Sequence, residues 1–383
     1  MIVNKKIITK IEGEATLKLY KKNEIIEFAQ IEFWQYRGIE EFLKNRHYLD
    51  ACVINPRVCG ICGHSHLIAT AKAIEDALNI EITEKAKILR EITLGLEIIQ
   101  NHIKWFYLTL YPTIKKIDFF KAFEFSKEIA KIIAIIAGQF PHNSYAIPGG
   151  VTCDLTNLDI LKIKNSLKKM FDKYQNVIDI KGDSKDLENL FNGISKELGK
   201  SINKFLVLGD NLYFKSNGDV EFVKEEQSIS FNKNVLYKDE FVEVGPLARN
   251  LNNKLIKVIY NSYKDSIYTR IFARIYEVNL IFKYLLKIID EININEKSYI
   301  KPKNCSGTGI GIVEAPRGSL IHKVEIENEK IKNYEIIVPT QFNLSNGTKN
   351  KPSAAQASLM NENEKFADFI FKCFDICAIC VSH

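Results

Sequence analysis

Two Cys-x-x-Cys motifs lie near opposite ends of the 383-residue chain. The first contains Cys59 and Cys62, and the second contains Cys377 and Cys380. In such a loop both sulfurs can point at one metal, and Gly60 lets the backbone turn tightly enough for that. Two loops supply four thiolates, so the pattern predicts metal or redox chemistry that draws on both ends of the chain.

Spacing alone leaves a structural four-cysteine zinc site open. Three features argue against it. The pairs are far apart in the sequence, whereas structural zinc usually joins a small local module. Histidines follow each pair at short spacing (His64 and His66 after the first, His383 after the second), which is more ligand-type residues than a closed tetrahedral site needs. The chain also stops at His383, an unusual place for such chemistry unless the terminus is buried.

The other four cysteines, Cys52, Cys153, Cys305 and Cys373, are scattered along the chain. A secreted disulfide framework would be denser and would stand in a shorter chain. These four cysteines also do not suggest a local iron–sulfur cluster motif. The chain therefore shows no evident path of its own for electrons.

Composition argues against several functional classes. Hydrophobic residues make up 46% and charged residues 26% of the chain, as in ordinary soluble globular proteins. The formal charge of +6 is spread as single lysines among acidic residues, which argues against nucleic-acid binding. The amino terminus lacks signal-peptide features, and the longest apolar run, 129–137, is broken by Lys131 and too short to span a bilayer. We expect a cytoplasmic protein, unless a partner subunit exports it or holds it at a membrane.

Hydrophobic periodicity predicts the elements that position the cysteines. An alternating segment from Ala15 to Trp34, with a polar turn, predicts a β-hairpin in an N-terminal region of about residues 1–35. Segments 318–326 and 331–338 predict a second hairpin. Apolar residues at helical spacing predict helices over 66–78, 83–111, 119–140, from 156 onward, 263–292 and 363–374. We expect the more polar stretch of about 181–245 to form loops and short strands.

The predicted fold class is mainly α with small antiparallel β-sheets, an α+β chain with a core of long helices. We expect residues 1–383 to form one large domain, with 181–245 as a more irregular insertion. Because the last predicted helix leads into the second cysteine pair, the fold must bring the end of the chain back to its beginning.

The cysteine motifs also carry a family resemblance. Arg-x-Cys-Gly-x-Cys, from Arg57 to Cys62, and Asp-x-Cys-x-x-Cys-x-x-His, from Asp375 to His383, resemble the motifs of the [NiFe]-hydrogenase large subunit. Six further blocks similar to that family follow in the right order: Lys10–Gly13, Tyr36–Glu40, Pro141-His142 with Pro148–Val151, Val244–Arg249, Glu314–Gly318 and Val338–Asn343. The resemblance covers nearly the whole chain. It implies that family's long-helix fold and its activity, the reversible heterolytic cleavage of dihydrogen.

By motif position, the resemblance implies a nickel–iron centre held by the four cysteines. Cys59 and Cys377 would be terminal thiolates on nickel, and Cys62 and Cys380 would bridge nickel to an iron that bears carbon monoxide and cyanide. Soft thiolates suit a thiophilic metal. Dihydrogen is nonpolar and a poor acid, so its heterolysis needs a metal pair and a nearby base that takes the proton.

The resemblance also implies roles for residues around the centre. Glu12 matches the family's proton-relay glutamate beside the nickel-bound thiolates. Arg317 would donate a hydrogen bond to a cyanide on the iron, with Asp375 orienting its guanidinium. His66 matches a histidine that donates to a bridging thiolate, a contact that tunes a metal without ligating it. His64 has no such match, and we expect it to be a solvated loop histidine.

A second metal is implied near the carboxy terminus. Glu40 and His383 match the positions that hold a separate Mg²⁺ or Fe²⁺ ion in the family. Proteolysis after that histidine commonly follows nickel insertion in relatives, so we expect either a maturation protease or a gene without an extension. Residue type alone would make Glu40 an ordinary acid at a helix start, Glu12 a surface residue at a strand end and Arg317 a turn residue.

Four positions depart from the family pattern. Ile376 replaces a rigid proline, Phe342 replaces a tryptophan and Lys10 replaces an arginine. A second acid that usually stands over the site, shortly after a Phe-Tyr pair, falls near Thr113 here. None of these departures removes a metal ligand, but the last one leaves the outer acids incomplete.

Oxidation of dihydrogen releases two electrons that must leave the site. The resemblance and the missing cluster motif together imply an iron–sulfur small subunit as partner, and they allow further electron-transfer subunits. Three alternatives stay open. A hydrogen sensor would share the site but turn over slowly. A non-catalytic quinone-oxidoreductase subunit of the same fold would have lost the nickel cysteines, and a structural zinc protein would not need the six matched blocks.

Overall fold

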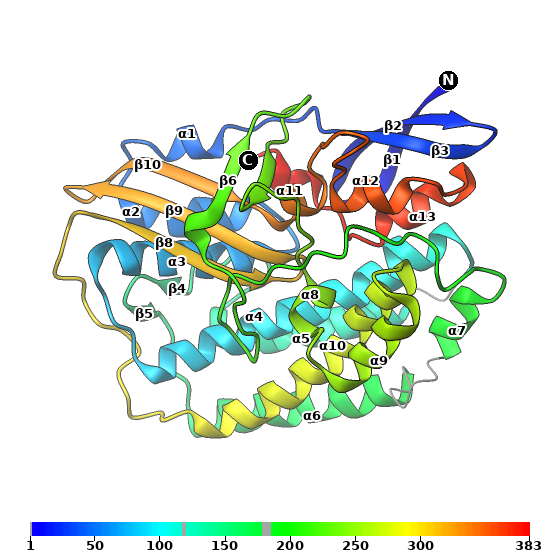
Figure 1. Cartoon of the computed structure of the whole chain (residues 1–383). Helices are drawn as coiled ribbons and strands as arrows, with labels where there is room; N and C mark the ends of the chain where they lie inside the picture. Colours follow the sequence, from blue (N-terminus) through cyan, green and yellow to red (C-terminus); the bar gives the residue numbers. More distant parts are fainter. Residues whose placement is uncertain (1, 117–119, 178–184) are drawn as a thin grey trace.

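The computed structural model describes residues 2–116, 120–177 and 185–383 (Figure 1). Long helices pack beside small antiparallel sheets, which confirms the predicted fold class. The helices are α1 (Ile39–Leu43), α2 (Tyr48–Ile54), α3 (Gly63–Leu78), α4 (Glu84–Lys104), α5 (Phe120–Ala137), α6 (Asn157–Val177), α7 (Lys185–Phe191), α8 (Pro246–Asn250), α9 (Lys254–Tyr263), α10 (Ile267–Ile288), α11 (Pro339–Asn343), α12 (Ala354–Leu359), α13 (Ala367–Lys372) and α14 (Ala378–Val381). None of these described helices is long and apolar enough to cross a membrane.

The strands form two three-stranded and two two-stranded antiparallel sheets in the described part of the chain. They are β1 (Ile2–Ile11), β2 (Gly13–Lys22), β3 (Ile25–Glu32), β4 (Ala146–Ile147), β5 (Gly150–Val151), β6 (Val223–Glu226), β7 (Asn234–Tyr237), β8 (Gly307–Ala315), β9 (Gly318–Glu327) and β10 (Lys330–Ile337). Neighbours in the sequence pair in each sheet, β1-β2-β3 and β8-β9-β10 in the larger ones. Both predicted hairpins are therefore confirmed, as β2-β3 and β9-β10, and each gains one further strand.

Four long helices, α4, α5, α6 and α10, pack against one another below the β8-β9-β10 sheet in Figure 1. Thr83 and Ser266 cap the starts of α4 and α10, each accepting a backbone N–H three residues on. The two helices approach closely at Gly95 of α4, where an added Cβ atom would lie 2.9 Å from Leu285 of α10. This packing fixes the face of α4 that lies toward the cysteines.

Helix α3 lies directly on strand β8. Gly309 and Gly311 of the strand face Ala69, Ala73 and Ala77 of the helix. The glycines are two residues apart, on one face of the strand, and the alanines are four residues apart, on one face of the helix. An added Cβ at Gly309 would stand 2.2 Å from the Ala77 nitrogen. The backbones can approach this closely only because neither row has bulk, and the contact sets the position of α3, which starts right after Cys62.

The two ends of the chain meet, as predicted. Ile26 of β3 exchanges backbone hydrogen bonds with the segment before α13, donating to Glu362 at 2.9 Å. Arg37 donates its backbone N–H to Ser382 at 2.7 Å, and Glu12 forms an isolated parallel bridge with Cys377. These contacts bring the second cysteine pair back against the N-terminal sheet.

Several predicted boundaries are wrong. The helix expected over 83–111 gives way to a π-helical turn at Trp105–Leu110. The helix expected over 263–292 begins only after Ser266, and a separate helix, α9, precedes it. The last predicted helix, 363–374, is reduced to α13, because a 3₁₀ turn precedes it. Long apolar patterns therefore marked helices correctly but hid the points where they break.

The stretch expected to be irregular, 181–245, contains helix α7 as well as β6 and β7. Its first residues, 181–184, and the predicted helix start at 119 lie outside the described residues. Strand β8 is not among the predicted strands, because its alternating glycines are not typical of a β-strand. These glycines allow the backbone of α3 to approach the strand.

Candidate metal centre

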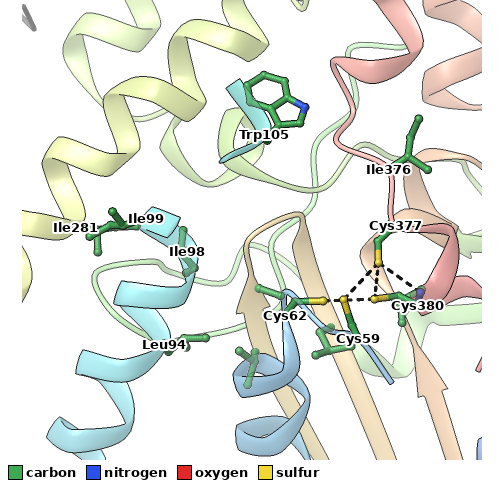
Figure 2. Close-up of a cluster of buried hydrophobic side chains, with 14 of the residues drawn as sticks. Cys59, Cys62, Leu94, Ile98, Ile99, Trp105, Ile281, Ile376, Cys377 and Cys380 are labelled. Carbon is green, nitrogen blue, oxygen red and sulfur yellow. Dashed lines mark hydrogen bonds between the residues drawn. The ribbon is translucent and has the colours of Figure 1, made fainter. Parts of the chain in front are cut away.

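The side chains of Cys59, Cys62, Cys377 and Cys380 converge on one point inside the protein (Figure 2). All four sulfur atoms lie within 4.8 Å of one another. Across the two motifs, the Sγ atoms of Cys59 and Cys377 are 3.5 Å apart, and those of Cys62 and Cys380 are 3.4 Å apart. No more than 5% of any of these residues is exposed. This compact set of buried sulfur donors fits a thiophilic metal centre.

The first cysteine pair is held by the start of α3. Gly63 lies so close to Pro56 that an added Cβ would stand 2.6 Å from the Pro56 carbonyl oxygen. Glu97 of α4 accepts hydrogen bonds from the backbone N–H of His64 at 2.8 Å and of Ser65 at 2.9 Å, and from the Ser65 hydroxyl at 2.6 Å. The buried carboxyl group of Glu97 thus caps the helix that follows the cysteine loop.

The second cysteine pair is held by the N-terminal sheet and by the start of α14. Cys377 bridges to Glu12, and the Ile379 N–H donates to the Glu12 carbonyl at 3.1 Å. The Cys377 N–H donates to the Thr340 hydroxyl at 3.3 Å, and its sulfur accepts the Cys380 N–H at 3.4 Å. Glu12 and Thr340, from two other parts of the chain, therefore fix this loop.

The expectation that Gly60 is needed for the first loop to turn is wrong. Its backbone lies outside the left-handed region, and a Cβ added there would meet no atom within 4 Å. The turn is instead set by Pro56 before the loop and by the capped start of α3 after it.

Crowding of the four sulfurs changes their acidity. Burial opposes ionisation of Cys59, but hydrogen bonds from the other three cysteines and the nearby Arg317 lower the pKa of its thiol well below the ordinary value. Hydrogen bonding to its neighbours raises the pKa of Cys62, and burial raises that of Cys380. One sulfur is thus favoured as a thiolate, the form in which cysteine binds metals.

Arg317 occupies the tight turn between β8 and β9 and reaches over the cysteines. Gly318, with φ +128°, closes this turn. The Arg317 Nε donates to the Asp375 carbonyl oxygen at 2.7 Å, and Nη2 donates to Asp375 Oδ1 at 3.0 Å. Only 4% of Arg317 is exposed, and it lines the same small cavity as Cys62 and Cys380. The structure therefore brings together the arginine and the aspartate that the motifs paired.

Asn101, and not Thr113, faces Arg317 from the helix side. Arg317 Nη1 lies 3.4 Å from Asn101 Oδ1, and the Asn101 amide donates to the Ile61 carbonyl at 2.6 Å. Thr113 donates its hydroxyl to the Thr109 carbonyl at 2.9 Å and contacts none of these groups. The expectation for Thr113 is wrong because α4 ends before the π-helical turn, which carries Thr113 away from the site. A neutral amide stands at this point.

Glu12 is half-buried in the wall of a cavity of about 230 Å³ that Arg317, Asp375 and Lys104 also line. Burial raises the pKa of Glu12, and the positive charge of Arg317 partly offsets this. Glu12 therefore holds a proton more readily than an ordinary glutamate does. A larger cavity, of about 520 Å³ beside Lys72, contains none of the four cysteines.

His66 is buried beside the sulfur cluster. It lines the small cavity with Cys62 and Cys380, while its Nδ1 lies 3.0 Å from Nε2 of His322. His322 in turn lies 2.8 Å from the Tyr334 hydroxyl. Burial lowers the pKa of His66 to about 3, so the imidazole is neutral at physiological pH. One ring nitrogen is occupied by His322, which leaves Nε2 for a contact on the other side.

The expectation that His64 is a solvated loop residue is wrong. It lies in the first turn of α3 and is only 1% exposed. Its Nε2 is 3.1 Å from the Asn143 amide nitrogen, and its Nδ1 is 3.9 Å from Glu97. Burial lowers the pKa of His64 to about 3. The predicted helix begins at His66, after His64, but α3 already begins at Gly63.

Glu40 and His383 meet at the buried carboxy terminus, with Oε1 and Nε2 3.7 Å apart. Glu40 also accepts the Ile336 N–H at 2.7 Å. Glu225 adds a second carboxylate close enough to influence both residues, and its Oε1 is buried without a partner. Lys233 lies 3.1 Å from its other oxygen. The Glu40 carboxylate and the His383 imidazole, with the Glu225 carboxylate in their electrostatic surroundings, are donors of the kind that bind a divalent cation.

Sequence reasoning missed Glu97, Asn101, Arg274, His322 and Glu225, which surround these groups. A signal existed for the first two, because they are polar residues four apart on the otherwise apolar face of a predicted helix. A signal existed for Arg274 also, since it interrupts the apolar face of its helix. Nothing in the sequence distinguishes Glu225 or His322 from ordinary strand residues.

Comparison with known proteins agrees with this geometry. The model of the nickel-dependent hydrogenase family matches residues 37–110 and 210–383. The coenzyme F420 hydrogenase subunit alpha of Methanothermobacter thermautotrophicus is 24% identical over 97% of this chain and 92% of its own. Sulfhydrogenase 2 subunit alpha of Pyrococcus furiosus is 26% identical over 100% of this chain and 99% of its own. The solved Ni-Fe-Se hydrogenase of Desulfovibrio vulgaris Hildenborough superposes with a TM-score of 0.89 at 21% identity, over 100% of both chains.

The family match spans both cysteine loops and most of the elements that position them. A structural zinc protein would account for four sulfurs but not for this match. The chain therefore belongs to the nickel-dependent hydrogenase family, as a catalytic subunit that cleaves dihydrogen reversibly at a nickel–iron centre.

Proposed function

We propose that Cys59 and Cys377 are terminal ligands of nickel and that Cys62 and Cys380 bridge nickel to iron. The observation that carries this proposal is the convergence of the four sulfurs within 4.8 Å. The first cysteine of each motif lies next to the first of the other, and the second next to the second. Both proposed bridging cysteines line the cavity beneath Arg317, together with Cys377. When bound, such a centre accepts the electron pair of the H–H bond.

The iron carries carbon monoxide and cyanide in this proposal, and Arg317 donates a hydrogen bond to a cyanide. A planar guanidinium in a buried, low-dielectric cavity is suited to an anionic acceptor. Two of its nitrogens are held by Asp375, which supports an orientation fixed before any ligand is present. Pro316 lines the same cavity beside it.

Glu12 takes up the proton released by heterolysis. Its main chain is tied to Cys377, so its side chain starts next to a proposed nickel ligand. The cavity of about 230 Å³ beside it gives its carboxyl group room to change orientation. Because burial raises the pKa of Glu12, its carboxylate is a better base than that of an exposed glutamate.

His66 donates to a bridging thiolate through Nε2. This role is supported by its contact with His322, which occupies Nδ1 and fixes the ring. Because burial keeps the ring neutral, the contact adjusts the electron density on sulfur without adding a charge to the site.

A separate Mg²⁺ or Fe²⁺ ion binds Glu40 and His383 in this proposal. Glu225 is included as a further oxygen donor, because one of its oxygens is buried and unpartnered. The cation would offset the negative charge that two carboxylates place near the carboxy terminus. It would also join α1 to the last residue of the chain, and so brace the loop that holds Cys380.

An iron–sulfur small subunit takes the electrons. Within the described residues, no group of cysteines converges besides the four-cysteine site, so this part of the chain shows no place for an iron–sulfur cluster. The other four cysteines do not join it: Cys52 and Cys373 are buried, Cys153 is partly exposed and Cys305 is exposed. The relatives carry names such as subunit alpha and large subunit, which supports an assembly of more than one chain. We also propose that residues 1–383 act as one domain in that assembly.

Infrared spectroscopy of the purified complex tests the centre, in the window where metal-bound cyanide and carbon monoxide absorb. We expect two cyanide bands and one carbonyl band that shift under hydrogen. A nickel-loaded sample without these bands contradicts the assignment of the centre. A sample with the bands but with negligible hydrogen uptake would support the sensor role instead of rapid turnover.

A further inference from the structure

Arg274 of α10 has no role in the function described so far, yet it binds Asp375 directly. Its Nη1 donates to Asp375 Oδ2 at 2.7 Å, while Arg317 Nη2 donates to the other oxygen at 3.0 Å. The Asp375 carboxylate is therefore shared by two buried guanidinium groups that come from different elements. Arg274 is itself held over the Trp105 ring, 4.6 Å from its centroid.

The contacts continue from Arg274 through two further buried side chains to Arg249. His102 Nδ1 lies 3.4 Å from Arg274 Nη1, and His102 Nε2 lies 2.6 Å from Glu277. Arg249 Nε donates to the other oxygen of Glu277 at 2.7 Å. Burial lowers the pKa of His102 to about 4. The neutral ring can accept from Arg274 at Nδ1 and donate to Glu277 at Nε2, so every contact in this chain is satisfied.

Arg249 returns the chain of contacts to the turn that carries Arg317. Its Nη1 donates to the Ala315 carbonyl at 2.6 Å, and its Nη2 lies 3.4 Å from the Pro316 carbonyl. The contacts therefore form a ring that starts and ends at Arg317 and its turn. Arg249 holds the backbone just before Arg317, and Asp375 holds the guanidinium at its other end.

We propose that Arg274 is a positioning residue that fixes Asp375, and through it the guanidinium of Arg317, over the metal centre. The inference rests on the proposed contact between Arg317 and an iron-bound cyanide. Asp375 has a left-handed backbone, with φ +54°, and lies between helices, so no regular structure orients its side chain. Without Arg274, one oxygen of this buried carboxylate loses its charged partner, and Arg317 gains freedom to rotate.

Arg270 provides a matched control one turn earlier on the same helix. It is equally buried, its guanidinium lies 4.5 Å from the centroid of the Phe374 ring, and it binds Glu243 at 2.7 Å. Its guanidinium donates to Glu243 and to the Gly199 carbonyl rather than to Asp375 or Arg317, so its replacement tests the cost of removing a buried arginine without disturbing the network.

The experiment compares Arg274→Met, Arg274→Lys and Arg270→Lys in the complete, metal-loaded complex. We expect Arg274→Met to shift or broaden the cyanide bands and to lower kcat by about 10–100-fold. Arg274→Lys should change the bands less, since lysine keeps the charge but not the directed fork. Arg270→Lys should leave the bands in place. If the Arg274→Met complex does not assemble, the cyanide bands and kcat of Arg274→Lys decide the test.

Unchanged bands and kcat in the decisive Arg274 variant would overturn the inference. Arg317→Lys, measured alongside, separates this result from a failure of the proposed function. Bands that change for Arg317→Lys but not for Arg274 leave the proposed contact standing and remove only the role of Arg274. Bands that change for neither variant show that Arg317 does not contact a cyanide, and both statements then fall.

Discussion

Gly311 of β8 lies so close to Ala69 of α3 that a Cβ atom added to the glycine would stand 2.0 Å from the alanine carbonyl oxygen. Gly309 meets the Ala73 carbonyl in the same way, at 2.3 Å. Helix α3 starts directly after Cys62, and β8 ends at the turn that presents Arg317. A close backbone contact between small residues therefore sets the distance between a metal-ligand loop and the arginine over it.

Replacement of Gly311 by alanine should push α3 away from β8. Because backbone atoms cannot move aside as a flexible side chain can, we expect a loss of about 2 kcal/mol in the free energy of unfolding, together with a lower nickel content. Thermal unfolding and metal analysis measure both. Gly60→Ala is the control for stability, since nothing lies within 4 Å of an added Cβ there. Equal stability of the two variants would contradict the packing argument.

Replacement of Cys377 by serine should abolish hydrogen uptake and reduce the nickel bound per chain. A serine hydroxyl stays protonated at physiological pH and is a poor ligand for a thiophilic metal. Metal analysis of the purified protein measures the loss. Cys305→Ser is the control, because Cys305 is exposed and is not one of the four converging cysteines. Full nickel content in Cys377→Ser would remove this residue from the ligand set.

Replacement of Glu12 by glutamine should lower hydrogen uptake by about 10²–10⁴-fold, the usual contribution of a positioned proton acceptor. The infrared bands of the centre should stay in place, since the neutral amide keeps the size of the side chain. Exchange of dihydrogen with deuterated water reports the proton step directly. Glu14→Gln, two residues on at an exposed position, should exchange at the normal rate. Unimpaired exchange in Glu12→Gln would show that another group takes the proton.

Glu97 should make the stability of the protein fall as pH rises. Burial raises the pKa of Glu97 to about 8, above the value of about 4.3 for an unfolded glutamate. Between these values the folded chain holds a proton that the unfolded chain has lost, so this contribution is complete below about pH 4.3 and disappears as pH passes 8. The slope is at most about 1.4 kcal/mol per pH unit.

Glu97→Gln removes this titration. Its melting temperature relative to the unmodified protein should therefore increase from pH 5 to pH 8, even though the amide caps α3 less well. Glu128→Gln, at a partly exposed position that pairs with Lys131, serves as the reference for a glutamate change that leaves the core intact. A difference between Glu97→Gln and the unmodified protein that does not vary with pH would show that Glu97 is ionised throughout.

The residue types and spacing of Cys59, Cys62, Cys377 and Cys380 were sufficient to predict a metal site made from both ends of the chain. The pairing of Arg317 with Asp375 and the approach of Glu40 to His383 also followed from motifs. Such predictions succeed because a ligand or a charged partner must have a particular chemical type, and that type is visible in the sequence.

Other features were decided only by tertiary structure. Asn101 rather than Thr113 faces Arg317 because a π-helical turn changes the rotation of the chain between them. His64 is buried because α3 begins at Gly63, earlier than the predicted start at His66, and packs its first turn into the core. Arg274 reaches Asp375 because α4 and α10 approach closely at Gly95 and bring His102, Glu277 and Arg274 into one buried network. Residue type shows which groups can bind or donate, but which of them meet depends on where helices end, how they are rotated and how closely their backbones approach.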